Sequence, residues 1–219
     1  MSNLDNISGR DYQFKMGQYF GRGWEIFNSY ALPFVGFTLL LVVIFGAMSF
    51  ILPFPLGTGE QGGGNIVANI LSPILGAGYY IVAFQIARNR PKAFGDFFQG
   101  FNRFLPILLY SIVSSILILV GFILLIIPGL YLAVSYVFGL PLLLDKSLDF
   151  WPALETSRKL VSKNWFSFFV FLILLGFLNI AGALLLGIGL LVTIPWTVCA
   201  VVAAYEDIVG LNSVADSAL

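Results

Sequence analysis

Histidine is absent from this sequence of 219 residues, and cysteine occurs only once, as Cys199. Without histidine, the chain cannot use imidazole for catalysis, for ligation of a metal or haem, or as a pH switch. A single cysteine excludes a disulfide within the chain. Charge is also scarce: 10% of the residues are charged, and the 11 basic and 11 acidic residues cancel. A neutral chain has no basic excess to attract nucleic acid, so we expect no nucleic-acid partner.

Apolar residues, in contrast, make up 59% of the chain, and phenylalanine alone fills 22 positions. Soluble domains are about 45–50% apolar and about 25% charged. A soluble domain of this length could not hide so much apolar surface, because its own exterior would have to be built from it. The composition therefore predicts an all-α integral membrane protein, with residues 1–219 forming a single membrane domain.

Four segments contain no charged residue: 26–59, 61–87, 104–144 and 164–205. A membrane-spanning helix needs about 20 apolar residues, so the first two segments hold one helix each and the last two hold a hairpin of two. Pro128-Gly129 and Gly187-Ile188-Gly189 mark the turns of these hairpins. The six predicted transmembrane helices cover 31–52, 66–87, 104–126, 130–146, 165–186 and 189–206. Re-entrant segments remain the alternative for a hairpin, since 130–146 is short for a span.

The basic residues predict the orientation of these helices. All of them lie in the N-terminal segment, between the second and third predicted helices, or between the fourth and fifth. The positive-inside rule places these segments in the cytoplasm, and both termini with them. The first apolar stretch begins near Ala31, behind a polar segment of mixed charge, so we expect an uncleaved anchor rather than a signal peptide.

Aromatic stripes precede the first, third and fifth predicted helices. In the middle one, phenylalanines at 94, 97, 98, 101 and 104 follow the spacing of one helix face. Such stripes suit amphipathic segments that lie in the headgroup plane on the cytoplasmic side. The alternative, which can hold at the same time, is that they pack on the ends of the spanning helices. The predicted membrane-surface anchors are Trp24, Phe94, Phe97, Phe98, Phe101, Trp151 and Trp165.

This order of segment and hairpin predicts a threefold internal repeat, with the three copies at 1–87, 88–146 and 147–219. The first copy consists of an amphipathic N-terminal segment, 1–30, and two helices within 31–87. Each copy has an asparagine beside an aromatic residue, and a glycine follows 18 or 19 positions later. The asparagines are Asn28, Asn102 and Asn164, and the glycines are Gly46, Gly121 and Gly182. The first copy differs by the Gly- and Pro-rich insertion Pro53–Asn65.

Three short patterns carry a resemblance to known families. They are an I-P-G-x-Y turn at 127–131, an A-L-x-x-S-x-x-L helix at 153–160 and a G-x-G-x-x-V-T-x-P start to the last helix at 187–195. With them, residues 90–208 resemble the YciC-like inner-membrane proteins and the membrane domain attached to some glycerophosphodiester phosphodiesterases. The resemblance implies a six-helix fold in a bacterial plasma (inner) membrane. It implies no catalytic residues, because the phosphodiesterase activity belongs to a separate soluble domain.

The predicted spans contain no charge, which argues against an ion-coupled transporter with a buried carboxylate. Asp145, Lys146, Glu206 and Asp207 are expected at the helix ends, where water can reach them. For Asp149, Glu155, Glu206 and Asp207, helix capping and ion pairing are favoured over a metal site. Polar residues within the spans are interpreted as interhelical hydrogen-bonding groups rather than a substrate path: Ser111, Ser114, Ser115, Asn179, Thr193 and Thr197.

We therefore expect no enzyme, no cofactor and no metal. The sequence favours a non-catalytic membrane protein that acts as a scaffold, an assembly partner or a lipid-organising component. Membrane lipids are the expected partners, another membrane protein is a further candidate, and the oligomeric state is open. The alternative is a transporter or channel for an apolar or lipid-like substrate, which would need no polar path.

Overall fold

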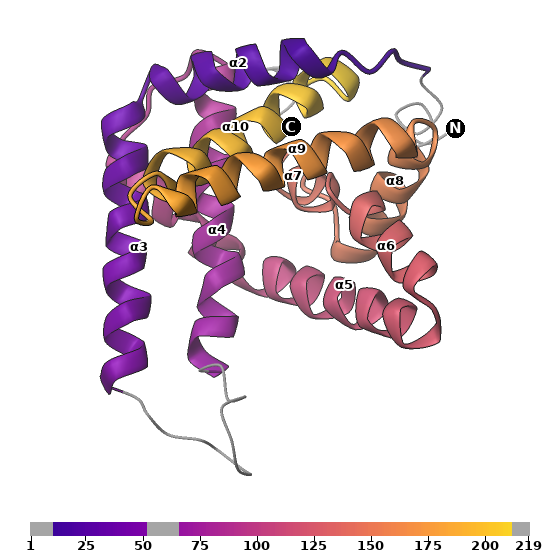
Figure 1. Cartoon of the computed structure of the whole chain (residues 1–219), viewed down its shortest axis with the longest axis horizontal. Coiled ribbons are helices and arrows are strands. Elements are labelled where there is room, and N and C mark those ends of the chain that lie inside the picture. The colour runs from indigo at the N-terminus through magenta and orange to yellow at the C-terminus, as the bar shows by residue number, and fades with distance from the viewer. Residues whose placement is uncertain (1–10, 52–65, 212–219) are drawn as a thin grey trace.

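The computed structural model describes residues 11–51 and 66–211, which are helical apart from short connections (Figure 1). The elements are α2 (Met16–Asn28), α3 (Ala31–Ile51), α4 (Ile66–Ala87), the 3-10 helix η1 (Phe94–Arg103), α5 (Phe104–Leu124), α6 (Ile126–Ser135), α7 (Gly139–Asp145), α8 (Phe150–Ser162), α9 (Trp165–Leu184) and α10 (Leu190–Ile208). The insertion Pro53–Asn65 lies outside the described residues.

Six stretches of helix have the length and composition to cross a membrane. They are Ala31–Met48, Val67–Ala87, Phe94–Leu124, Ile126–Asp145, Trp165–Leu184 and Leu190–Ile208. Five of them are 18 to 21 residues long, close to the length of about 20 apolar residues that the hydrocarbon core requires, and Phe94–Leu124, which includes η1, has 31. The chain is thus an all-α multipass membrane protein, as its composition predicts.

The fourth predicted helix differs from the expectation in two ways. It begins at Ile126 rather than at 130, because Pro128 lies in the first turn of α6, where a missing N–H breaks no helical hydrogen bond. It is also interrupted between Ser135 and Gly139, shortly before Pro141. At this break the Ser157 hydroxyl of α8 donates to the carbonyl of Ser135 at 2.7 Å and accepts from the N–H of Phe138 at 3.1 Å. A side chain far along the sequence therefore satisfies the backbone that the break exposes.

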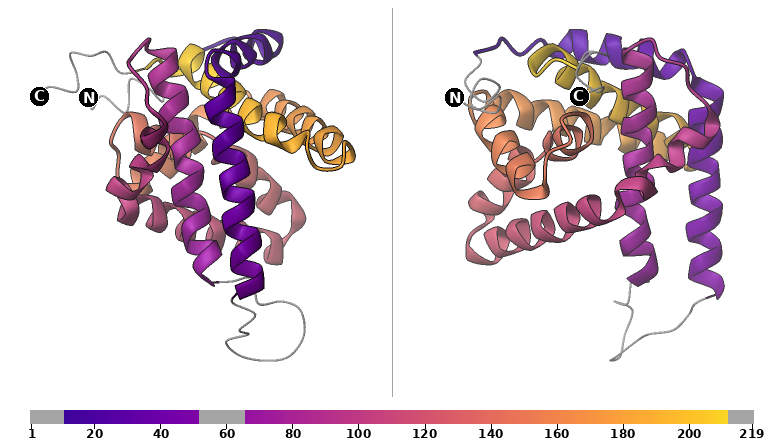
Figure 2. Two further views of the ribbon diagram at one scale, coloured as in Figure 1. Left: turned by 90° about the vertical axis from the view of Figure 1, so that its left-hand side faces the viewer. Right: turned by 180° about the vertical axis from the view of Figure 1, so that it is seen from behind.

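The helices divide into an inner and an outer set. In α4, in α6 with α7, and in α10, between 50% and 56% of the residues of each span are buried. In the spans of α3, α5 and α9, which precede them along the chain, only 17% to 22% are buried. Figure 2 shows that the C-terminal end of α3 and the N-terminal end of α4 point in one direction, whereas the α9–α10 turn points in another. The inner helices thus hold the molecule together, and the outer helices present their apolar surface outward.

The segments ahead of α3, α5 and α9 all pack on the inner helices. Helix α2 lies against α10, η1 lies against α4, and α8 lies against α6 and α7. α3, in turn, packs mainly on α10 and makes few contacts with α4. The aromatic stripes therefore face the protein along at least part of their length.

Contact between η1 and α4 explains why this segment departs from the expected helical spacing. A Cβ at Gly78 of α4 would lie 2.0 Å from the Phe97 carbonyl oxygen, and one at Gly100 would lie 2.3 Å from the carbonyl oxygen of Ile74. Because both residues lack a Cβ, the backbones of η1 and α4 can touch directly. The buried residues of η1, Phe97 and Gly100, are three apart, which fits the three residues per turn of a 3-10 helix.

Two of the three glycines that align in the proposed repeat have the same role. Gly121 faces Gly129 across the α5–α6 turn, and Gly182 faces Gly189 across the α9–α10 turn, in each case too closely for a Cβ. At Gly46 the space is open. The threefold repeat itself stays a prediction.

Glycine 23 offers a direct test of how α2 is seated. A Cβ at Gly23 would lie 2.6 Å from the backbone of Ala200 in α10, whereas one at Gly21 would meet nothing within 4 Å. Gly→Ala in a helix interior stabilises by up to about 1 kcal/mol, while overpacking costs about 1–3 kcal/mol. We expect Gly21→Ala to raise the melting temperature in detergent and Gly23→Ala to lower it. Shifts of the same sign in both variants would contradict this packing.

Candidate functional site

A buried carboxylate marks the place where three inner helices end together. Asp145 is the last residue of α7, and its side chain is 0% exposed. It forms an ion pair with Arg88, which directly follows α4, and another with Lys146 at 3.2 Å. Its second oxygen also accepts a hydrogen bond from the Tyr205 hydroxyl of α10 at 2.9 Å. We call these four residues the Asp145 cluster.

Aromatic rings form the walls of the Asp145 cluster. The Tyr205 ring lies with its centroid 5.5 Å from those of Phe84 and of Phe138, so rings from α4 and from the α6–α7 break meet on α10. The Arg88 guanidinium stands 5.4 Å from the centre of the Phe84 ring, within the range of a cation–π interaction. These contacts help to bury the Asp145 carboxylate, so the loss of one of its partners is costly.

The partly buried position of Arg88 affects both the pKa and the hydrogen bonding of its guanidinium. Burial, and after it the charge of Arg90, lowers the pKa of the Arg88 guanidinium below its ordinary value. Its Nε is buried and has no hydrogen-bond partner among the described residues. Lys146 also has a partner outside the cluster: its ammonium donates a hydrogen bond to the carbonyl of Gly210 at 3.0 Å.

The burial of Asp145 corrects the expectation that water reaches this residue. Its sequence position, at the end of a predicted span beside Lys146, is typical of a hydrated helix end. The tertiary structure instead brings Arg88 and Tyr205 onto it from 57 and 60 positions away. The sequence shows that Arg88, Asp145 and Lys146 lie at the ends of predicted spans. It does not show which of these helix ends come together.

The chemistry of the Asp145 cluster is that of a structural anchor. One carboxylate is shared between two cations and a phenol, and the chain has no histidine to add to it. A buried ion pair of this kind adds little net stability, but it is strongly destabilising to break. It therefore suits the task of fixing which helix ends lie together.

A second polar site is an open pocket of about 280 Å³ between α2 and α10. Its lining residues are Gln18, Tyr19, Arg22, Ala203, Glu206 and Asp207. Arg22 pairs with Glu206 at 3.3 Å, while Asp207 accepts from the Tyr19 hydroxyl at 2.9 Å and pairs with Lys15 at 3.2 Å. The hydrogen bond to Glu206 raises the pKa of Arg22, and burial raises that of Tyr19. The pocket charges thus already have partners within the protein.

The acidic residues considered as metal ligands are spread over the molecule. Glu155 pairs with Arg158 at 2.8 Å and with Lys159 at 3.5 Å, and the hydrogen bond from Arg158 lowers its pKa. Glu206 and Asp207 belong to the pocket on α10. Across residues 11–51 and 66–211, no group of three acidic or cysteine side chains lies close enough to hold a metal ion.

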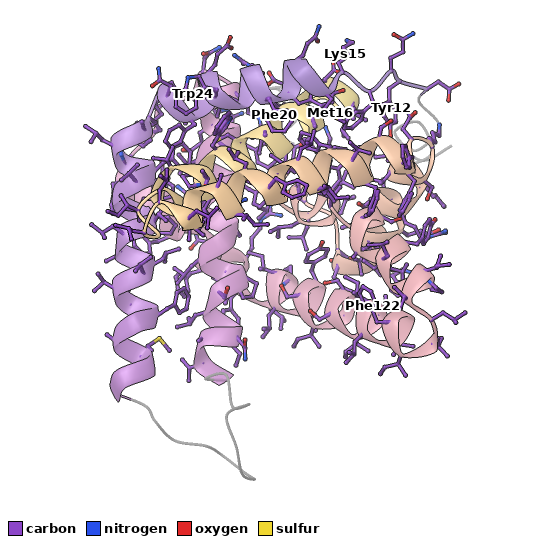
Figure 3. The ribbon with its side chains drawn as sticks, in the orientation of Figure 1. Tyr12, Lys15, Met16, Phe20, Trp24 and Phe122 are labelled. Atoms are coloured by element: carbon purple, nitrogen blue, oxygen red, sulfur yellow. The ribbon has the colours of Figure 1, made fainter. Side chains whose placement is uncertain are left out.

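The predicted membrane-surface anchors fall into three groups. Trp24, Phe94, Phe101 and Trp151 are exposed, whereas Phe98 and Trp165 are half-buried. Phe97 is fully buried and stacks on Phe37 at 4.4 Å, so it packs at the end of the helices and does not face a membrane surface. Figure 3 shows Trp24 on the same segment as Tyr12, Met16 and Phe20, of which the last three pack partly against the core. The packing alternative therefore applies to Phe97, and the membrane-surface role of the exposed rings stays a prediction.

Most polar side chains within the spans bond locally. Ser111 donates to the carbonyl of Ile107 at 2.9 Å, and Thr197 donates to that of Thr193 at 2.8 Å. Asn179 of α9 links to α10 by donating to the Thr197 hydroxyl at 2.8 Å. The Oδ1 of Asn179 and the Oγ1 of Thr193 are buried and have no partner within the described part of the chain.

The chain matches no protein-family model, no curated protein and no solved structure. Function must therefore be argued from this geometry.

The ion pair of the Asp145 cluster can be tested against an exposed pair in the same molecule. Breaking a buried pair costs about 3–5 kcal/mol, whereas an exposed pair contributes about 0–1 kcal/mol. We expect Arg88→Met to lower the free energy of unfolding by about 3 kcal/mol, and Arg22→Gln, which breaks the exposed pair with Glu206, to change it little. In the double variant Arg88→Met/Asp145→Asn, part of the loss should be recovered. Additive losses in this double-mutant cycle would show that the two side chains are not coupled.

Phe97 and Phe101 form a matched pair on η1, because one is 0% and the other 44% exposed. Removing a buried phenylalanine side chain costs about 3–5 kcal/mol, so Phe97→Ala should strongly lower stability in detergent. Phe101→Ala should leave stability in detergent unchanged and lower it only in lipid nanodiscs, as expected of a membrane-surface anchor. Equal losses in detergent would assign both rings to internal packing.

Proposed function

We propose that this protein is a non-catalytic, lipid-contacting scaffold of a bacterial plasma membrane, with both termini in the cytoplasm. The observation that carries the proposal is the exposure of the outer helices α3, α5 and α9, whose spans are no more than 22% buried. Apolar side chains such as Leu39, Leu119 and Phe177 are 50–63% exposed along them. In a bilayer, acyl chains or another membrane protein cover such surfaces.

The polar side chains of the spans support a non-catalytic role. Several hydroxyls of the spans are engaged within the protein: Thr38 donates to the carbonyl of Phe34 at 2.8 Å and accepts from the Tyr79 hydroxyl at 2.8 Å. Such bonds occupy the hydroxyl hydrogen, so these groups have no donor left for a polar substrate. The Asp145 cluster, whose carboxylate is fully buried, joins the ends of α4, α7 and α10.

The positions of the basic residues support the orientation. Arg88, Arg103 and Lys146 gather around the ends of the inner helices, where Arg103 donates to the carbonyl of Leu143 at 3.2 Å and to the Ser147 hydroxyl at 2.6 Å. Basic residues at helix ends favour the cytoplasmic face and its anionic lipids. The resemblance to inner-membrane families agrees with this placement.

One observation favours the alternative, a transporter or channel for an apolar or lipid-like substrate. Where α9 and α10 adjoin, Asn179 and Thr193 each bury a polar atom that has no partner among the described residues. Buried polar atoms of this kind are costly unless something pairs with them. A polar group of a passing substrate would be one such partner.

Reconstitution into phospholipid vesicles separates the two functions. For a scaffold, we expect spin-labelled phospholipid to show a motionally restricted population that grows with protein content, because the outer helices offer a large surface to acyl chains. Transbilayer movement of a fluorescent phospholipid should match that of protein-free vesicles. Acceleration that is lost in Asn179→Leu would contradict the scaffold proposal and support transport through α9 and α10.

A further inference from the structure

The turns between α5 and α6 and between α9 and α10 are entirely apolar and yet exposed. In the first, residues 124–127 are 68–79% exposed, and in the second, Leu184, Leu185, Leu186 and Ile188 are 68–92% exposed. Residues 116–130 and 180–192 contain no side chain that can form a hydrogen bond. The connection between α3 and α4 differs, because its sequence includes Thr58, Glu60, Gln61 and Asn65. Two of the three connections therefore lack the groups that water would solvate.

The backbone of these two turns is largely satisfied from within. The N–H of Leu125 donates to the carbonyl of Gly121 at 3.0 Å, and that of Gly187 donates to Ala183 at 2.9 Å. Short bonds continue through the second turn, where Ile188, Leu190 and Leu191 each donate three residues back at 3.1 Å. A turn in water does not need these internal hydrogen bonds, because water can pair with its backbone. Backbone in hydrocarbon does need them, because no solvent there can accept or donate a hydrogen bond.

Paired glycines close both turns tightly. A Cβ at Gly121 would lie 2.9 Å from the Cα of Gly129, and one at Gly189 would lie 2.7 Å from the Cα of Gly182. Helix backbones at this distance leave no space for water between them. Close approach through glycine is also how helices pack in lipid, where no hydrophobic drive holds them together.

Helix length limits how far these turns can reach. α5 has 21 residues and α9 has 20, so each is about 30 Å long, the same as the hydrocarbon core of about 30 Å. Figure 1 shows α5 beginning beside α4 and running away from it at a steep angle rather than alongside it. Two helices that cross steeply cannot both stand upright in a bilayer, and a tilted helix of this length ends before the far surface.

We propose that the α5–α6 and α9–α10 turns end inside the hydrocarbon, where residues 124–127 and 184–188 contact the acyl chains of lipid. The two helix pairs then enter and leave the membrane on the same side. By its polar sequence, the connection between α3 and α4 is the one expected in water on the opposite side. This inference depends on membrane insertion alone and not on the scaffold role.

Single cysteines can locate each connection in the full-length protein. In a Cys199→Ala background, we compare Leu125→Cys and Leu186→Cys at the two turns with Gly62→Cys in the polar connection, using a membrane-impermeant maleimide on intact and on opened cells. We expect Gly62→Cys to be labelled and both turn variants to be labelled less than about a tenth as much in either preparation, because hydrocarbon excludes the reagent. Labelling of a turn at the level of Gly62→Cys would overturn the proposal.

A spin label on the same cysteines identifies what covers the turns. Contact with acyl chains predicts high accessibility to dissolved oxygen and low accessibility to a water-soluble nickel chelate. Strong dipolar broadening between labels of neighbouring molecules, with low oxygen accessibility, would assign the turns to an interface between copies and overturn the contact with lipid.

A charge at Leu186 gives an independent measurement. This side chain is 92% exposed, so replacing it removes almost no contact within the protein. Leu186→Lys should reduce the amount of inserted, folded protein several-fold, since a charge is costly in hydrocarbon, whereas Gly62→Lys should not. Equal yields of the two variants would place the α9–α10 turn in water.

Discussion

A buried carboxylate must be paired, and the pairing of Asp145 constrains the rest of this molecule. Its partners come from the ends of α4 and α10 and from the adjoining Lys146, so three inner helices cannot separate without exposing a charge to an apolar environment. In hydrocarbon, helices gain nothing from the hydrophobic effect when they meet, so a specific polar contact is an effective way to choose which ends associate. The rings of Phe84 and Phe138 around Tyr205 seal this junction.

The division into inner and outer helices follows from that junction. Helices whose ends meet at Asp145 are buried along half of their residues, and the helices that precede them are left at the periphery. The connecting segments α2, η1 and α8 then fill the space over the inner helices, with glycines such as Gly23 and Gly78 at the points of closest approach. Packing is thus concentrated near the charged helix ends, and apolar surface increases away from them.

The increase of apolar surface away from the charged helix ends explains why lipid is a suitable partner for the molecule. Apart from Ser115, the exposed residues described in α3, α5 and α9 are apolar, and so are the α5–α6 and α9–α10 turns. Surfaces of this kind need a medium without water. A scaffold that offers broad apolar faces, held together at one charged end, can order acyl chains around it without any catalytic group.

The sequence by itself determined the class of the protein and the extent of most of its helices. Charge-free runs of the required length predict the spans because hydrocarbon excludes charge, and α4 has the predicted bounds. Local pattern could not show that α6 and α7 are separate, since the hydroxyl that satisfies the break belongs to Ser157 of another helix. The same limit applies to the site: Asp145 reads as a hydrated helix end, and only the tertiary structure brings Arg88 and Tyr205 to it. Long-range pairing depends on how the helices pack, and a single sequence does not encode that packing in any local spacing.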